Sequence, residues 1–347
     1  MPCDIIKKRG DKMKRRNIFV DIFKIALVYL VVCTHFHPYF LQSGIFRLAV
    51  PAFFMISGFF QYSNDEQVKN KKAINFVKSS IKYLLIGFLI YMIYDISIAI
   101  KDDKKISSVI STFVYKDFLL NFGFYNYPIT TGYHLWYLVS IVVVSIINYF
   151  IIKTKNEKIY KFTFLLLAVP LFFSGLLYRI NEDFVGTNIT RNALFTGLPL
   201  FSIGYELARR NKKRSISELI IFFMLGCIFF YIQHIEKIYL FTRQIEFYFS
   251  SVLSSIFFIL FFTNLPKLPE IPNKIFYLIF GKSCSLYVYI FHLMIGNILI
   301  NYHEYKRSWE VCKYSFFGAL AISIIINLIT LLTKFVVNRF KKKEVLT

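Results

Sequence analysis

The sequence has 347 residues, of which 56% are hydrophobic and 19% aromatic, and its mean hydropathy is +0.53. This composition excludes an ordinary soluble enzyme, because a soluble chain of this length carries far more charged surface. A formal net charge of +22 would suit a nucleic-acid-binding protein, but the basic residues lie in short clusters between apolar runs, as topology signals do. The five cysteines show no metal-binding spacing, so we expect no metal.

Apolar runs of about 20 residues, the length that crosses a hydrocarbon core of about 30 Å, recur along the whole chain. We therefore predict an all-α fold, a polytopic membrane bundle of about ten transmembrane helices. It forms a single transmembrane domain over residues 1–347, with basic tails at 1–17 and 337–347. The predicted spans are, in chain order, Ile18–Phe40, Phe46–Tyr62, Ile74–Ile100, Tyr133–Ile152, Ile159–Tyr178, Arg191–Ala208, Ile216–Gln233, Ile245–Leu265, Ile275–Ile300 and Cys312–Val336.

The distribution of basic residues assigns a side to each loop. With the N-terminus inside, the inner segments carry 29 of the 42 lysines and arginines and the outer segments carry 12, with Lys24 inside the first span. Cytoplasmic segments of membrane proteins are enriched in Lys and Arg. We therefore expect both termini in the cytoplasm.

The first span carries two ionisable side chains, Lys24 and His35. Eleven residues at 100° each come within about 20° of three full turns, so both lie on one helix face about 16 Å apart. Ionisable groups within a span are costly and often mark a functional interior. The alternative is that each side chain reaches the nearer headgroup region.

Further polar residues recur near the predicted outer side of other spans. Each alone has a bland explanation, such as lipid phosphate for an arginine, the interface for a histidine or helix packing for a serine. Several such groups at similar depth on different spans favour a shared site. They are Arg47 at the outer start of the second span, His134 of "YHLWYL", Arg191, and His292 of "SLYVYIFHL", while Ser57 lies deeper in the second span.

On the inner side, Lys78 and Lys82 of "FVKSSIKYLL" are four residues apart and share a helix face. They could hold an anionic ligand or simply mark topology, and topology explains them without a ligand.

Several of these stretches resemble the acyltransferase-3 family of bacterial ten-span membrane proteins. The resemblance begins with "DIFKIALVYLVVCTHFHP" and "FRLAVPAFFMISGFF" and continues through "FVKSSIKYLL", "YHLWYL", "TRNALFTGLPLFSIGYELARR" and "SLYVYIFHL". Two features depart from the family pattern: Lys24 occupies a position that is usually Arg, and the family's R-x-x-R pair is represented only loosely by Lys78 and Lys82. The sequence also resembles the membrane part of vancomycin-resistance serine racemases, which is assigned to serine supply.

The resemblance implies an enzyme of the bacterial plasma membrane. It would transfer an acetyl or other short acyl group from cytoplasmic acetyl-CoA (acyl-CoA) to a hydroxyl of a cell-surface polysaccharide or lipid-linked glycan. The partners would be this donor, this acceptor and membrane lipids, without nucleic acid. Two alternatives stay open: a transporter of a small metabolite such as serine, and a glycan flippase or polymerase.

The candidate residues divide by role under this interpretation. His35 is the expected general base or transient acyl carrier, and Arg47 or Arg191 would stabilise an oxyanion or hold an acidic group of the acceptor. The full set is His35, Arg47, His134 and His292 as catalytic, Lys24, Lys78 and Lys82 as binding the acyl-CoA, and Arg191, Ser57 and Trp136 as binding the acceptor.

The charge distribution makes a testable prediction of topology. Reporters fused at positions 211 and 343 should be cytoplasmic, and a reporter at 184 should lie outside, because the inner segments hold most of the basic residues. Alkaline phosphatase and fluorescent protein fusions measure this directly. A cytoplasmic position for 184 would overturn the span count.

Overall fold

The computed structural model describes residues 17–36, 44–107, 109–110, 131–171, 191–240, 247–266, 275–277, 279–281, 283–303 and 308–344. Every regular element among these residues is helical, which confirms the all-α prediction. The main helices are α1 (Ile18–Phe36), α2 (Ala49–Gln61), α3 (Glu66–Lys101), α6 (Trp136–Lys153), α10 (Leu198–Arg209), α11 (Ile216–Leu240), α12 (Phe249–Asn264), α14 (Cys284–His303) and α15 (Trp309–Glu344). Shorter helical pieces are η3 (Gly44–Leu48), η5 (Tyr133–Leu135), η6 (Glu157–Lys161), η7 (Thr163–Leu167), α7 (Ala168–Leu171) and η10 (Ala193–Gly197).

Six helices in the described part of the chain are long and apolar enough to cross a membrane. They are Ile18–Phe36, Glu66–Lys101, Tyr133–Lys153, Ile216–Tyr239, Cys284–Asn301 and Trp309–Val337. Two shorter apolar helices, Phe46–Gln61 and Phe249–Asn264, correspond to the second and eighth predicted spans. The predicted span Ile159–Tyr178 is represented by short pieces up to Leu171, and its remainder lies outside the described residues, as do residues 37–40 of the first span. The number of ten spans and the cytoplasmic position of the termini stay predictions.

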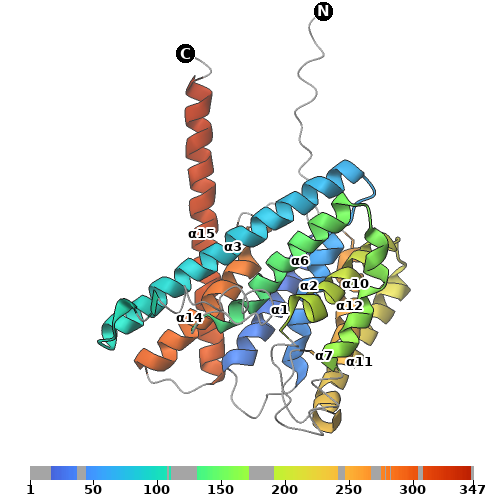
Figure 1. The fold of residues 1–347 in the computed structure, drawn as a ribbon, viewed down its shortest axis with the longest axis horizontal. Helices are drawn as coiled ribbons and strands as arrows, with labels where there is room; N and C mark the ends of the chain where they lie inside the picture. Colours follow the sequence, from blue (N-terminus) through green and yellow to red (C-terminus); the bar gives the residue numbers. More distant parts are fainter. Residues whose placement is uncertain are drawn as a thin grey trace, which may run out of the picture.

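Helix α1 lies in the middle of the bundle and contacts α2, α12, α14 and α15 (Figure 1). Its sequence contains no Gly or Pro, and its aliphatic residues are buried against these neighbours. The helix starts at a cap, because the Asn17 side chain accepts hydrogen bonds from the amides of Phe19 (3.1 Å) and Val20 (3.4 Å). The same side chain donates to the carbonyl of Phe262 at 3.1 Å, which ties the start of α1 to the end of α12.

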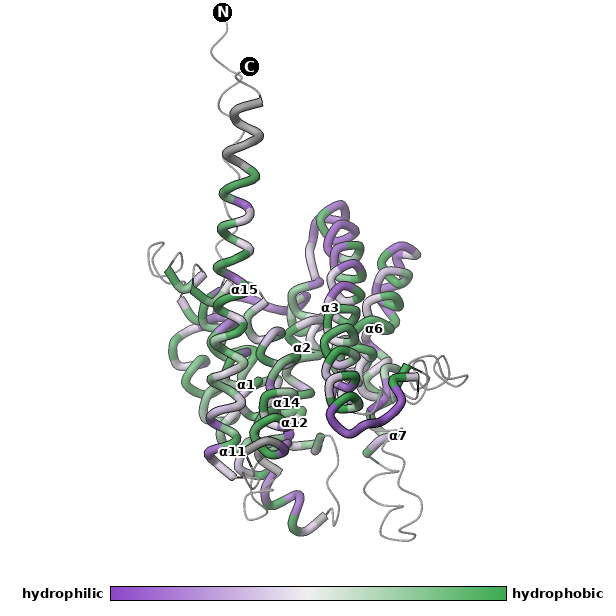
Figure 2. The backbone as a smooth tube through the Cα atoms, turned by 90° about the vertical axis from the view of Figure 1, so that its left-hand side faces the viewer, coloured by the Kyte–Doolittle hydropathy of each residue, from purple (hydrophilic) through white to green (hydrophobic). Residues whose placement is uncertain are grey.

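Large apolar side chains cover the outside of the bundle. On α3 they recur at four-residue spacing, with Leu85 60%, Leu89 53% and Ile93 59% exposed. Figure 2 shows hydrophobic residues along most of the length of the bundle helices. A continuous exposed apolar surface of this kind is stable against lipid but not against water. The structure is therefore that of a multi-pass membrane protein.

Segments that the charge pattern assigns to the cytoplasmic side meet at one end of the bundle. Lys69 forms an ion pair with Glu157 at 2.5 Å, and Tyr205 donates a hydrogen bond to the same carboxylate at 2.5 Å. Asn264 donates to the side chain of Asn211 at 3.1 Å. The first two contacts join the predicted inner segments 63–82 and 153–161 to the end of the sixth span, and the third joins segment 209–214 to the end of the eighth. This grouping agrees with the predicted alternation of the spans.

Helices α2 and α10 cross at two glycines. A Cβ atom at Gly58 would lie 1.9 Å from the carbonyl oxygen of Phe201, and one at Gly204 would lie 1.9 Å from that of Met55. Each glycine thus faces the backbone of the other helix, a close approach that small residues permit between membrane helices. Because η3 leads directly into α2, this crossing also fixes the position of Arg47.

Replacing either glycine with alanine should disrupt this crossing. We expect Gly58→Ala and Gly204→Ala to destabilise the protein by about 1–3 kcal/mol, since backbone atoms must move to admit a methyl group. Thermal unfolding of the detergent-purified protein measures the effect. Gly318→Ala is the matched control, because a Cβ there meets Ile295 at an ordinary 3.4 Å; equal melting temperatures for all three variants would contradict the prediction.

Candidate functional site

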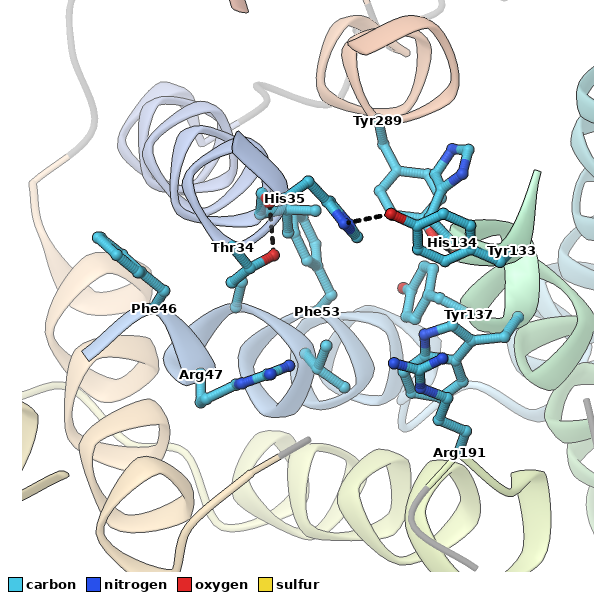
Figure 3. Close-up of a pocket in the computed structure, with 14 residues that line it drawn as sticks. Thr34, His35, Phe46, Arg47, Phe53, Tyr133, His134, Tyr137, Arg191 and Tyr289 are labelled. Carbon is cyan, nitrogen blue, oxygen red and sulfur yellow. Dashed lines mark hydrogen bonds between the residues drawn. The ribbon is translucent and has the colours of Figure 1, made fainter. Parts of the chain in front are cut away.

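A pocket of about 150 Å³ lies beside the last turn of α1, where His35 reaches it (Figure 3). Four other parts of the chain contribute to its wall: η3 with α2, η5 with α6, the residue Arg191, and α14. The lining residues are Val31, Thr34, His35, Phe46, Arg47, Ala49, Val50, Phe53, Tyr133, His134, Trp136, Tyr137, Arg191 and Tyr289. The pocket therefore combines segments that are far apart in the sequence.

Three histidines form a cluster at one side of this pocket. The ring centroids of His35 and His292 are 5.4 Å apart, those of His134 and His292 are 5.0 Å apart, and those of His35 and His134 are 6.3 Å apart. The Nδ1 atom of His35 lies 3.2 Å from the Tyr133 hydroxyl, and this hydrogen bond holds the ring at the pocket wall. Among the described residues, no group of three His, Cys, Asp or Glu side chains is arranged to hold a metal ion.

The hydrogen bonds of His292 define its tautomer. Its Nδ1 lies 2.7 Å from the carbonyl oxygen of Tyr289. A carbonyl can only accept, so Nδ1 carries the hydrogen and, in the neutral ring, Nε2 is left as the proton-accepting atom. This Nε2 is buried and has no hydrogen-bond partner within the described part of the chain. His292 is therefore a buried imidazole whose basic nitrogen is available.

His134 is also fully enclosed, but its ring is held mainly by packing. The carbonyls of Tyr289 and Ile290 lie close to it, yet neither ring nitrogen has a hydrogen bond of good geometry among the described residues. The ring packs against those of Tyr91 and Tyr289, with centroid distances of 5.1 and 5.2 Å. The hydroxyl of Tyr289 in turn donates to the backbone carbonyl of His134, which joins α14 to η5.

The two arginines extend into the pocket from the side opposite His35 (Figure 3). Arg47 belongs to η3, which packs on α11 and α12. The start of α12 is held by Glu236 of α11, whose carboxylate accepts from the amides of Phe249 and Ser250 at 2.9 Å each. Carboxylates stabilise helix N-termini in this position. The α11–α12 pair thus forms a fixed base for the arginine on η3.

The structure brings together most of the residues that the sequence singled out. His35, Arg47, His134, Trp136 and Arg191 all line the pocket, and His292 contacts two of its histidines. Ser57 lies behind the wall.

The hydroxyl of Ser57 donates to Phe53 at 2.9 Å and interacts with Tyr137. Both of these neighbours line the pocket. Ser57 therefore supports the wall and is not among the residues that line the cavity.

The three lysines lie elsewhere. Lys24 is 3.6 Å from the carboxylate of Asp21 and is placed over the ring of Phe60 at 5.2 Å. Lys78 and Lys82 are exposed on α3. None of the three is among the described lining residues of the pocket.

The sequence analysis missed the tyrosines of the pocket. Tyr133 and Tyr137 are four residues apart on one helical face, and Tyr289 is three residues before His292. This spacing relative to the histidines is the only signal that could have identified them, because the chain contains 24 tyrosines. Their hydroxyls add polar groups to a wall that is otherwise aromatic and aliphatic.

Comparison with known proteins places this site in a family. Residues 17–335 match the Acyltransferase domain of the acyltransferase-3 family. The chain is 25% identical over 240 residues to a serine/alanine racemase of Enterococcus gallinarum, a match that covers 61% of this chain and 32% of the racemase. It is 24% identical over 351 residues to an amino-acid racemase of Enterococcus faecalis, with 90% of this chain and 45% of that protein covered.

Each of these matches spans less than half of the relative's own length. No solved structure matches the chain. The family match extends from the cap of α1 to the last third of α15 and so includes every residue of the pocket. The protein belongs to the acyltransferase-3 family.

Proposed function

We propose that this protein transfers an acetyl or other short acyl group from cytoplasmic acyl-CoA to a hydroxyl of an extracytoplasmic cell-surface glycan. The observation that carries the proposal is the meeting of His35, Arg47 and Arg191 in one pocket at the end of α1. A base beside guanidinium groups can supply the two functions that acyl transfer to a hydroxyl uses, removal of the hydroxyl proton and stabilisation of the oxyanion. The aromatic wall, with Trp136 and three tyrosines, suits the flat apolar face of a sugar ring.

In this proposal His35 accepts the proton of the acceptor hydroxyl as its oxygen attacks the thioester carbonyl. Arg47 or Arg191 donates hydrogen bonds to the oxyanion that develops at that carbonyl. The acyl-CoA supplies the thioester, and the proton held by His35 is returned to the departing thiolate. The same geometry also permits an acyl-histidine at His35, from which the acyl group would pass to the hydroxyl in a second step.

The basic residues of the predicted inner half are complementary in charge to acyl-CoA, which is a polyanion. Lys24 lies about 16 Å from His35 along α1, towards the end where the loops assigned to the cytoplasm meet. Lys78 and Lys82 are exposed near the inner end of α3. We assign these lysines to attraction of the CoA phosphates outside the pocket, with His35 acting at the thioester end.

The competing function is transport of a small metabolite such as serine. It is favoured by the names of the two Enterococcus racemases, which match this chain over 61% and 90% of its length. A pocket with arginines and hydroxyl groups also suits a hydroxyl-bearing amino acid. A glycan flippase or polymerase is the third alternative.

Acyl transfer by the purified protein separates these functions. Incubation with labelled acetyl-CoA and surface glycans of the host should move the label to the glycan, because an acyltransferase needs no transmembrane gradient for this step. Proteoliposomes without CoA should accumulate no labelled serine. Serine uptake together with label that stays in CoA would instead establish the transporter.

His35→Ala should lower the rate of acyl transfer by about 10²–10⁴-fold, the contribution typical of a general acid–base group. His35→Gln should be nearly as slow, since an amide forms hydrogen bonds but does not accept a proton at neutral pH. The matched control is His234→Ala on α11, outside the histidine cluster, which should retain wild-type activity. Membrane abundance is measured beside the rates, and equal rates for His35→Ala and His234→Ala would exclude His35 as the base.

Arg47→Lys tests whether the guanidinium acts at the oxyanion. Lysine keeps the charge but loses the planar fork of donors, and removal of one oxyanion donor typically costs about 10²–10³-fold. We expect a rate reduction of about tenfold or more without loss of insertion. Arg210→Lys, on the exposed inner loop, is the control, and activity of Arg47→Lys within about twofold of the control would leave Arg47 as a headgroup anchor.

A further inference from the structure

A side chain of α3 enters one turn of α14. The Tyr91 hydroxyl donates to the carbonyl of Ile290 at 2.9 Å and accepts from the backbone amide of Met294 at 3.1 Å. These two backbone groups are four residues apart and bond directly to each other in a regular α-helix. The hydroxyl therefore bridges the two ends of this turn, within a helix that runs without interruption from Cys284 to His303.

His292 is the residue at the centre of that turn. Its Nδ1 is committed to the Tyr289 carbonyl, and its Nε2 is buried without a hydrogen-bond partner among the described residues. Its ring contacts both His35 and His134. A change in the backbone between Ile290 and Met294 would consequently move the imidazole that borders the proposed base.

Burial and packing fix the Tyr91 side chain at this position. Its side chain is 1% exposed, so its hydroxyl has no access to water and depends on these two backbone partners. Gly132 leaves room for it, because a Cβ there would lie 3.1 Å from Tyr91 Cγ. The ring also packs against that of His134 at 5.1 Å. Tyr91 does not line the pocket and so acts through its neighbours.

We infer that Tyr91 is a positioning residue, which fixes the Ile290–Met294 turn of α14 and thereby holds the His292 imidazole against His35. In the proposed reaction, on which this role rests, His35 gains an N–H when it accepts the proton of the hydroxyl. The ring of His292 packs against that of His35, with centroids 5.4 Å apart, and so helps to set where this N–H lies. His292 thus orients the ring of the base, and Tyr91 keeps His292 in place.

The test compares Tyr91→Phe with Tyr83→Phe. Both variants remove a single hydroxyl that links α3 to α14, because the Tyr83 hydroxyl bonds to Ser283 at the start of α14. Only Tyr91 is bonded to the turn that contains His292. Deuterium exchange at the C2 position of each histidine ring, followed by mass spectrometry on monodisperse protein, reports ring environment without any need for activity.

The inference predicts that Tyr91→Phe changes the exchange rate of His292 while Tyr83→Phe leaves it at the wild-type value. It also predicts that Tyr91→Phe lowers kcat about 10–100-fold with KM for acyl-CoA unchanged, since a misplacement of about 1 Å has effects of that size. In a His292→Ala background, Tyr91→Phe should cause no further loss, because the two residues act as one unit.

Equal His292 exchange in the two tyrosine variants would overturn the inference, as would a further loss of activity when Tyr91→Phe is added to His292→Ala. If the wild-type protein transfers no acyl group, the proposed function fails. The exchange measurement then decides alone whether Tyr91 positions His292.

Discussion

The last turn of α1 places the imidazole of His35 inside an apolar bundle. The other polar groups of the site lie around this imidazole and bond to it or to one another. Hydrocarbon offers no hydrogen-bond partner, so a buried polar atom has to find one in the protein or in a ligand. His35 is hydrogen-bonded to the Tyr133 hydroxyl, His292 to the carbonyl of Tyr289, and the Tyr289 hydroxyl to the carbonyl of His134. After these bonds are made, several imidazole nitrogens beside the cavity have no hydrogen-bond partner among the described residues. These nitrogens can accept or donate protons.

Contacts between the helices hold the polar groups of the pocket in position. The two glycines at the α2–α10 crossing bring backbones into contact, and η3 enters α2 from a base formed by α11 and α12. On the other side, Tyr91 links α3 to the middle of α14. These links come from separate helix pairs, and α1, which carries His35, also packs directly on η3, which carries Arg47.

The sequence alone predicted the parts of the structure that depend on hydropathy and charge. The helical class, most of the helices and the meeting of the loops that were predicted to be cytoplasmic follow from apolar length and from the positions of Lys and Arg. It also identified His35, Arg47, His134 and Arg191, because ionisable groups in apolar segments are rare enough to stand out. Lys24 stood out for the same reason, but it pairs with Asp21 one turn away, an interaction that reduces the need for a distant partner.

The site residues that the sequence analysis missed belong to residue types that are frequent along this chain. Tyrosines are frequent throughout the chain, so neither the pocket tyrosines nor Tyr91 is distinguishable by composition. Their roles depend on contacts between α1, α3, α6 and α14 that no spacing within one helix encodes. Short pieces such as η6 and η7 were likewise predicted as part of a continuous span, because apolar composition does not report a local change of helix type.

The central claim is that the thioester of the donor is attacked beside His35. An electron cryo-microscopy structure of the protein with a non-hydrolysable acyl-CoA analogue tests it most directly. The account predicts the acyl end of the analogue in the pocket between His35 and the two arginines, with the nucleotide end on the side of Lys24. An analogue whose acyl end lies outside this pocket, or an empty pocket at saturating analogue, would contradict it.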